Sequence, residues 1–289
     1  MTAIRITEVG PRDGLQSESA CLSTAVKVQF IDLLSAAGIP EIEVSSFVSS
    51  KWVPQLADAA EVFAAIQRRI GTSYSALVPN EQGFDRACAA RADKIAVFIS
   101  ATEEFSQRNA NGSIAEVLAR IAPVVKRARA AGIPVRGYVS CVIRCPFAGE
   151  VSPAQVRGVC AALLELGVDE LDLGDTIGAA TSDSIARLYE GLFPLVAPSA
   201  TTLHLHDTHG RAIACALRAL ELGVRSFDSS AGGLGGCPYA PGAPGNVATE
   251  SLVAAAKSAG FVSGVDTQRV AEAGLWIRQQ LSLARGASL

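Results

Sequence analysis

Short apolar runs alternate with longer segments in which apolar residues recur every three or four positions, and this pair repeats eight times along the chain. The short runs are typical of buried strands, and the three- and four-residue spacing is typical of amphipathic helices. The predicted strands are 4–9, 41–44, 72–77, 94–99, 135–139, 170–173, 202–206 and 226–229, and the predicted helices are 24–38, 54–70, 81–92, 114–132, 153–167, 182–196, 211–223 and 247–260. One more helix is expected at residues 266–284, with Leu275, Ile277 and Leu281 on its apolar face.

The regular alternation of strand and helix predicts a parallel sheet whose crossover connections are helices. Eight such units close naturally into a (β/α)8 TIM barrel. The alternative is an open doubly wound sheet, which favours a GxGxxG turn after the first strand, whereas residues 10–14 have the sequence GPRDG. We therefore predict an α/β protein with one TIM-barrel domain over residues 1–289, including the extra C-terminal helix.

Composition and charge narrow the classes of function. Hydrophobic residues make up 49% of the chain and charged residues 18%, which is typical of a globular protein and not of a disordered one. The net charge is −3 and no basic stripe is present, so we expect no nucleic-acid partner. No apolar run is long enough to span a bilayer and no leader pattern opens the sequence, so we expect no membrane association and a cytoplasmic location. The seven cysteines are scattered and odd in number, which favours reduced thiols.

Polar residues at the carboxyl ends of the predicted strands are the candidates for chemistry, because TIM-barrel active sites lie on that rim. His204 and His206 end the seventh strand, and residues two apart on a strand point to the same face. Asp13 follows the first strand and is available across the barrel mouth. A pair of hydrogen-bonded core histidines is the alternative, but imidazoles with a carboxylate suit a divalent ion such as Mg²⁺ or Mn²⁺.

Arg12 and Gln16 flank this candidate metal site in sequence and are predicted to bind substrate. A guanidinium fork can hold a carboxylate or an enolate oxygen with two hydrogen bonds. The alternative for Arg12 is an ordinary surface ion pair with Asp13 at a turn. Gln16, one turn further on, is placed to help Arg12.

A glycine-rich loop, residues 232–245, follows the eighth strand and carries Cys237. Its glycines predict neither helix nor strand, and they place the thiol where it can act as a proton donor or nucleophile. An incidental exposed cysteine is the alternative. Asn246 is either a metal ligand or the N-cap of the last barrel helix, and Glu250 is expected to orient its neighbours.

Taken together, these residues resemble the 3-hydroxy-3-methylglutaryl-CoA lyase family. The matching stretches are EVGPRDGLQSE (8–18), EVSSFVSSKWVPQLAD (43–58), RGYVSC (136–141), LGDTIGAAT (173–181), HLHDTHGRA (204–212) and SAGGLGGCPYAPGAPGNVATE (230–250). The resemblance implies a (β/α)8 barrel that uses Mg²⁺ or Mn²⁺ to cleave its acyl-CoA substrate into acetyl-CoA and acetoacetate. It also implies a place in leucine degradation and ketone body formation, and a homodimer is one candidate assembly.

The resemblance also implies roles for individual residues. The implied metal ligands are Asp13, His204, His206 and Asn246. Arg12 resembles the arginine that polarises the substrate, and Cys237 resembles the loop cysteine that donates a proton. Glu43, Asp175 and Glu250 match acidic residues that are important in the family, and the first two are taken here as catalytic.

Three positions near the rim depart from the family pattern, namely Arg144, His209 and Arg211. They leave open the same cleavage of a longer 3-hydroxy-3-alkylglutaryl-CoA. A condensing acyltransferase of the isopropylmalate synthase kind shares the barrel and the metal strand but not the GGCPYA loop. A metal-dependent acyl-CoA binder without catalysis is the third alternative.

Overall fold

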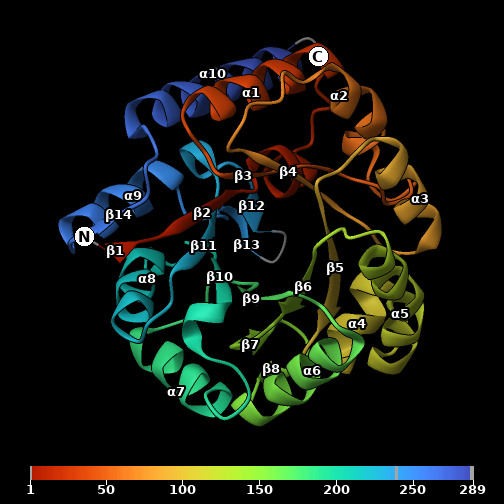
Figure 1. Ribbon diagram of the computed structural model, residues 1–289. Helices are drawn as coiled ribbons and strands as arrows, with labels where there is room; N and C mark the ends of the chain where they lie inside the picture. The colour runs from red at the N-terminus through yellow and green to blue at the C-terminus, as the bar shows by residue number, and fades with distance from the viewer. Residues whose placement is uncertain (1, 238–239, 287–289) are drawn as a thin grey trace.

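The computed structural model describes residues 2–237 and 240–286, with the backbone alone for residue 237 and residues 240–244. Eight parallel strands close into a barrel, and helices form a ring around it (Figure 1), which confirms the predicted (β/α)8 fold. Neighbouring strands in the barrel are also successive barrel strands along the chain. They are β2 (Arg5–Glu8), β3 (Glu41–Ser46), β4 (Ser73–Leu77), β5 (Lys94–Ser100), β6 (Val135–Ser140), β9 (Glu170–Asp175), β10 (Thr201–Leu205) and β11 (Ser226–Ser229).

The outer helices begin and end at local signals in the sequence. Ser113 and Glu116 form a reciprocal capping box at the start of one helix, with backbone-to-side-chain distances of 3.2 and 2.7 Å. Gly167 ends another with a φ of 95°, a conformation that favours glycine. The ring comprises α1 (Thr24–Ala36), α2 (Ala59–Ala65), α3 (Glu81–Ala89), α5 (Ile114–Ala130), α6 (Pro153–Leu166), α7 (Ser182–Leu192), α8 (Ala212–Glu221) and α9 (Thr249–Ser258).

Two segments differ from the prediction. The helix expected at 54–70 is divided into a single turn, Pro54–Leu56, and the short helix α2. Helix α2 ends early because the backbone becomes extended at Ile66. An additional helix, α4 (Glu103–Ala110), follows β5. Its sequence has only one large apolar residue, Phe105, so it offers no apolar stripe from which to predict it.

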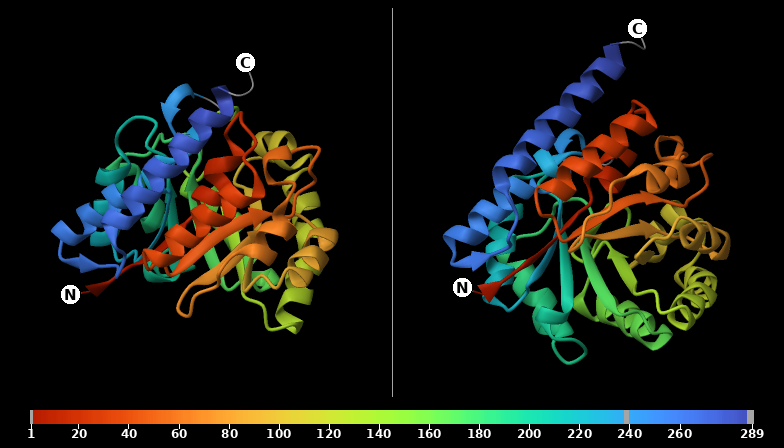
Figure 2. Two further views of the ribbon diagram at one scale, coloured as in Figure 1. Left: turned by 90° about the horizontal axis from the view of Figure 1, so that it is seen from above. Right: turned by 45° about the horizontal axis from the view of Figure 1, so that its top comes forward.

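The predicted C-terminal helix is present as α10 (Thr267–Gly286) and lies along α1 on the outside of the barrel (Figure 2). Ile277 and Leu281 are buried as expected, but Leu275 is 64% exposed, so its assignment to the apolar face was wrong. Val270, Ala273 and Gly274 complete the buried face instead.

The start of α10 and its carboxyl end lie at opposite ends of the barrel. Just before α10, β14 (Phe261–Val262) pairs with β1 (Thr2–Ala3) beside the amino ends of the barrel strands. Near its carboxyl end, Arg278 Nε donates to the carbonyl of Gly232 at 3.1 Å, and Arg285 forms an ion pair with Glu18. The helix therefore connects the base of the barrel to the loops on its rim. No helix in the described ranges is both long and apolar enough to cross a membrane.

The inside of the barrel carries a layer of buried charges. Arg136 is 1% exposed, and its guanidinium lies 3.0 Å from both Glu170 and Asp228 and 3.1 Å from Glu41. Lys94 lies 2.5 Å from Glu170 and 3.1 Å from Glu41. These side chains compensate one another, and removal of one member of such a pair typically costs about 3–5 kcal/mol. The charged layer lies directly beneath the residues of the rim.

Glu8, at the end of β2, holds three segments together. One carboxylate oxygen accepts the N–H groups of Gly10 and Ala231, both at 2.9 Å, and the other accepts the hydroxyl of Thr249 at 2.7 Å. Burial raises the pKa of Glu8 to about 7, and the three hydrogen bonds only partly oppose this rise.

This raised pKa predicts a pH-dependent stability. Between pH 4.5 and 7 the unfolded state has already lost the Glu8 proton while the native state still holds it, so stability falls as pH rises through this window. As pH rises from 4.5 to 7, the unfolding free energy of the wild-type protein should therefore fall by about 3 kcal/mol more than that of Glu8→Gln. Denaturant unfolding at pH 5 and pH 8 measures the difference. Glu61→Gln, at an exposed carboxyl on α2, is the control, and an equal response in both variants would contradict the assignment.

Candidate active site

A tight turn after β2 positions Arg12 and Asp13 on the rim. Residues Gly10–Gly14 form one turn of π-helix, η1, in which the N–H groups of Arg12, Asp13 and Gly14 all donate to the carbonyl of Val9. At Gly14 a Cβ atom would lie 3.0 Å from the carbonyl oxygen of Leu234, so the close approach of the next loop favours glycine there. The turn thus fixes both charged side chains in place.

Asp13, His204 and His206 meet at the mouth of the barrel. Their candidate ligand atoms all lie within 4.8 Å of one another, as the sequence predicted. His204 lies on β10 and His206 directly follows that strand, with ring centroids 5.2 Å apart. Burial lowers the pKa of His206 to about 4, so its imidazole is neutral at pH 7 and keeps a lone pair. Burial opposes ionisation of Asp13, but the charges of Arg12 and the two histidines hold its pKa well below the usual value.

Asn246 lies beside this cluster. Its Nδ2 donates to Asp13 Oδ2 at 2.9 Å and to the carbonyl of Leu234 at 3.2 Å. The Oδ1 atom of Asn246 and the Nδ1 atom of His206 are buried and have no hydrogen-bond partner among the described residues. Buried polar atoms are rarely left unpartnered, and both atoms carry lone pairs that a cation can accept. The donor set of carboxylate, two imidazoles and an amide oxygen fits a divalent metal ion.

The alternative role for Asn246, as the cap of the last barrel helix, is wrong. Helix α9 begins at Thr249, and Ala248 is its N-cap residue, two positions beyond Asn246. The side chain of Asn246 is instead directed to Asp13. An isolated bridge between the backbones of Asn246 and His206 fixes its position on the rim.

Arg12 is buried and paired, and is not part of a surface ion pair. Its Nε donates to Glu43 Oε2 at 2.6 Å and its Nη1 donates to Asp13 Oδ1 at 2.5 Å. The guanidinium carbon lies 5.4 Å from the centre of the Tyr138 ring. Within the described part of the chain, Nη2 makes no hydrogen bond, so one donor edge is left for a ligand.

Glu43, on β3, is 1% exposed and lies against Arg12. Its Oε2 also accepts the hydroxyl of Tyr138 at 3.3 Å, while its Oε1 is buried without a partner among the described residues. Burial raises the pKa of Glu43, although Arg12 opposes that rise. Glu43 therefore fixes the orientation of the guanidinium.

Asp175 ends β9 and is also buried. Its two carboxylate oxygens accept the N–H groups of Ala179 and Ala180, each at 2.9 Å. Burial raises its pKa to about 6, and these hydrogen bonds together with the charges of Arg211 and His204 limit the rise. The side chain holds the loop that follows β9 in position on the rim.

Gln16 follows η1, and Glu250 lies beside the loop that follows β11. The Oε1 atom of Gln16 is buried without a described partner, and Glu250 Oε2 accepts the N–H of Gly232 at 3.0 Å. Glu250 and Arg278 thus hold Gly232 from its two sides. The expected orienting contact of Glu250 is with this glycine.

The glycine-rich loop contains regular structure, so the prediction of neither helix nor strand was wrong there. Strand β12 (Gly236–Cys237) pairs antiparallel with β13 (Ala240–Pro244), because glycine weakens a strand without forbidding it. The Cys237 side chain, on which the proposed proton donation depends, lies outside the described residues.

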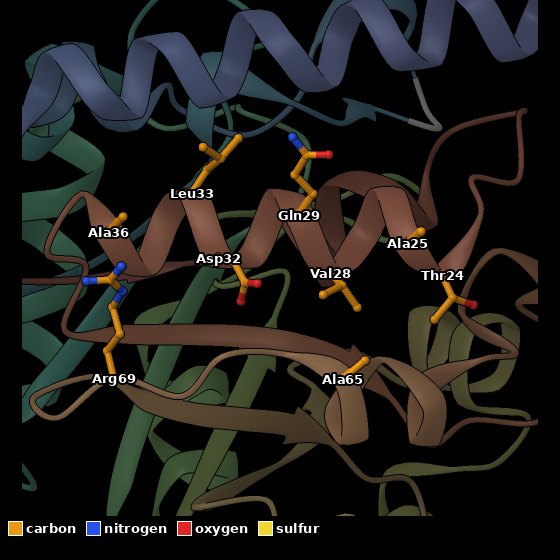
Figure 3. A pocket seen from close by; sticks show the side chains of 9 residues that line it. All are labelled: Thr24, Ala25, Val28, Gln29, Asp32, Leu33, Ala36, Ala65 and Arg69. Atoms are coloured by element: carbon orange, nitrogen blue, oxygen red, sulfur yellow. The ribbon is translucent and has the colours of Figure 1, made fainter.

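A surface groove of about 660 Å³ lies between α1 and α2, on the outside of the barrel (Figure 3). Its lining includes none of the residues at the barrel mouth and is mostly aliphatic, with Asp32 and Arg69 as its charged members. In Figure 3 the side chain of Leu33 points away from Arg69, toward α10. The groove is therefore separate from the candidate site.

The layer beneath the rim, which includes Tyr138, Arg136 and Asp228, was not predicted from the sequence. A signal for it was present, because polar residues occur at every second position of several predicted strands. Glu41 and Glu43, or Glu170 and Asp172, are two such pairs. In a closed barrel this alternation places the polar residues on the inside and the apolar ones against the helices.

Comparison with known proteins gives one consistent result. The family model described as HMGL-like matches residues 3–277. The mitochondrial hydroxymethylglutaryl-CoA lyase of Bos taurus is 50% identical over 279 residues, which are 96% of this chain and 86% of the bovine one. The crystal structure of the HMG-CoA lyase from Brucella melitensis superposes with a TM-score of 0.96 at 47% identity, covering 98% of this chain and 100% of that one. An HMG-CoA lyase from Acinetobacter baumannii, in complex with coenzyme A and 3-methylmalate, superposes with a TM-score of 0.92 at 35% identity, covering 97% and 92%.

Proposed function

The chain belongs to the HMGL-like family, and on this premise we propose that the residues at the barrel mouth form its metal-dependent active site. The protein is a carbon–carbon lyase that cleaves 3-hydroxy-3-methylglutaryl-CoA into acetyl-CoA and acetoacetate. The observation that carries the proposed site is the convergence of Asp13, His204 and His206, with a free donor edge of Arg12 beside them.

Asp13, His204, His206 and Asn246 hold Mg²⁺ or Mn²⁺ in this proposal. The buried, unpartnered lone pairs of His206 and Asn246 support it, as does the neutral state of His206 at pH 7. When bound, the cation lowers the pKa of the substrate's tertiary hydroxyl group and orients it with the neighbouring carbonyl or carboxylate oxygen. Mixed ligation by imidazole nitrogens with carboxylate and amide oxygens suits both metals.

Arg12 meets the charge that develops as the bond between carbons two and three breaks. The carboxylate of Asp175 accepts the hydroxyl proton in this proposal, carbon three becomes the ketone of acetoacetate, and the bonding electrons pass to the thioester enolate. The free Nη2 edge of Arg12 donates to the enolate oxygen, while Glu43 and Asp13 keep the guanidinium oriented. Gln16 assists in binding the substrate through its amide.

Asp175 and Glu250 complete the proposed site. Asp175 has a pKa of about 6, in the range suited to proton transfer near neutral pH, and its position at the end of β9 supports a catalytic role. Glu250 supports the glycine loop through Gly232.

Cys237 is the proposed acid that protonates carbon two of the enolate. Its place in the GGLGGCPYAPG loop supports this role, and a thiol with an ordinary pKa near 8.5 is mostly protonated at pH 7. Cys237→Ser raises the pKa of the donor, so we expect kcat to fall by about 10²-fold or more.

Steady-state kinetics measures this change, and Mn²⁺ binding should be unaffected because no ligand has changed. Cys21→Ser, at an exposed thiol, is the matched control. A Cys237→Ser enzyme with wild-type kcat would assign the protonation to another group.

A substrate panel tests the proposed function and the choice of acyl group. Stripped protein is supplied with Mg²⁺ or Mn²⁺ and with 3-hydroxy-3-alkylglutaryl-CoA thioesters of increasing chain length. We expect the highest kcat/KM for the 3-methyl substrate and no turnover without metal. A higher kcat/KM for a substrate with a longer alkyl chain would instead indicate that Arg144 selects the acyl group from its position on the rim. Arg144 pairs there with Glu150 at 3.1 Å.

Three further proposals concern organisation. We infer that residues 1–289 act as one domain, that the enzyme assembles as a homodimer and that it works in the cytoplasm. Gel filtration with light scattering measures the assembly, and cell fractionation measures the location.

A further inference from the structure

The buried carboxylate of Asp228 lies beside Nδ1 of His204, a residue that also belongs to the cluster with Asp13 and His206. We propose that Asp228 is a positioning residue that keeps the proton of His204 on Nδ1, so that Nε2 presents its lone pair to the metal ion. This inference rests on the proposed metal site and extends it by one residue, which the family resemblance did not supply.

Backbone register and hydrogen bonding support the contact. His204 and Asp228 are direct partners in the parallel ladder between β10 and β11, so their side chains enter the barrel side by side. Asp228 Oδ2 lies 3.1 Å from His204 Nδ1, and Asp228 is 1% exposed. A carboxylate has no proton to donate, so this hydrogen bond requires the proton on the imidazole Nδ1. The remaining nitrogen is then a lone-pair donor, as metal-bound histidines need.

Arg136 fixes the other half of the Asp228 carboxylate. Its Nη1 donates to Asp228 Oδ1 at 3.0 Å, and its Nη2 donates to Thr7 and Glu170 at 2.9 and 3.0 Å. Because a guanidinium has donors only, Asp228 must present an oxygen to it. Both oxygens of Asp228 are therefore committed, one to Arg136 and one to His204.

A second group of side chains, Asp172, His204 and Asp228, also lies within 4.8 Å and could in principle hold a cation. The guanidinium of Arg136 already occupies this side, 3.4 Å from Asp172 and 3.0 Å from Asp228. A divalent ion there would be placed beside a buried positive charge. The metal-binding side of His204 is therefore the one facing Asp13.

The substitution Asp228→Asn gives a specific expectation. The amide has one oxygen and one NH₂ group, and the donor-only guanidinium of Arg136 selects the oxygen. The NH₂ group then faces His204 Nδ1 and donates to it, which moves the imidazole proton to Nε2. The substitution keeps the shape of the side chain but blocks the nitrogen that binds the metal.

The test combines a tautomer measurement with metal binding. The chain has three histidines, so long-range ¹H–¹⁵N spectra of the metal-free protein can be assigned with single His→Ala variants. At a pH where His204 is neutral, we expect its proton on Nδ1 in the wild type and on Nε2 in Asp228→Asn. The Kd of Mn²⁺, measured by electron paramagnetic resonance without substrate, should rise by about 10- to 100-fold in the variant.

Thr7→Val is the matched control, because it removes a hydrogen bond of Arg136 without touching His204. It should leave both the tautomer and the Kd of Mn²⁺ unchanged. If Asp228→Asn does not fold, the wild-type spectrum still tests the proposal, since a proton on Nε2 of His204 would overturn it. An Asp228→Asn protein with wild-type tautomer and wild-type Kd also overturns it. A wild-type protein that binds no Mn²⁺ would contradict the proposed metal site, while the tautomer would still test the role of Asp228.

Discussion

Replacing His206 by alanine should lower kcat/KM by about 10³-fold or more, because a lost ligand removes several kcal/mol of transition-state stabilisation. His206 is one of three side chains whose ligand atoms lie within 4.8 Å, and its burial keeps it neutral and free to bind a cation at pH 7. No neighbouring side chain in the described ranges replaces it, since Asn246 and Asp13 already belong to the same cluster. Steady-state kinetics with saturating Mg²⁺ or Mn²⁺ and elemental analysis of the purified protein measure the effect together.

The control uses the third histidine of the chain. His209 is exposed on the loop after β10, and His209→Ala should retain wild-type activity and metal content. Treatment of the wild type with a chelator should reproduce the loss seen in His206→Ala, and added Mg²⁺ or Mn²⁺ should restore only the wild type. Full activity in stripped protein, with no metal by elemental analysis, would contradict the metal-dependent site.

Arg12→Gln should lower kcat by about 10³-fold while changing KM much less, because the guanidinium meets charge that exists only in the transition state. The Nη1 atom of Arg12 lies 2.5 Å from Asp13, so we expect the guanidinium and the proposed metal to act on neighbouring oxygens of the substrate. Steady-state kinetics gives kcat and KM separately and so shows whether transition-state stabilisation or substrate binding is lost. A variant with unchanged kcat and a raised KM would make Arg12 an anchor for the bound substrate.

The substitution also leaves Glu43 and Asp13 without their shared partner, so stability has to be followed with activity. Burial already raises the pKa of Glu43, and loss of Arg12 should let this carboxyl bind a proton and remain in place. Arg68→Gln is the matched control, because it breaks an ion pair with Asp93 in the segments before the amino ends of the strands. It should change thermal stability without lowering kcat.

The fold could be predicted from sequence because each unit carries its own local signals. Helix α5 has an apolar stripe and a capping box, and α6 ends at a glycine with positive φ. Where such signals are weak the prediction failed: α4 has no apolar stripe, and the 54–70 helix ends early at Ile66. Tertiary contacts, not local propensity, determine those two segments.

The candidate site was predictable in part, for a different reason. Asp13, His204 and His206 could be placed together because a parallel barrel brings all strand ends to one rim. The partners of these residues could not be predicted from the sequence, since the contact of His204 with Asp228 depends on the register between β10 and β11. The role of Asn246 was also open, because its position just before α9 is compatible with an N-cap. Only the folded structure shows that its side chain is directed to Asp13.

The course of α10 bears on how the protein should be handled in the laboratory. Thr2 is paired with Phe261 beside the base of the barrel, whereas Arg285 pairs with Glu18, two residues from Gln16, on the rim. An affinity tag or fluorescent fusion at the amino terminus is therefore held away from the barrel mouth. Helix α10 ends at Gly286 on the side of the rim, so a fusion placed directly after it should lie beside the barrel mouth and hinder the access of substrate.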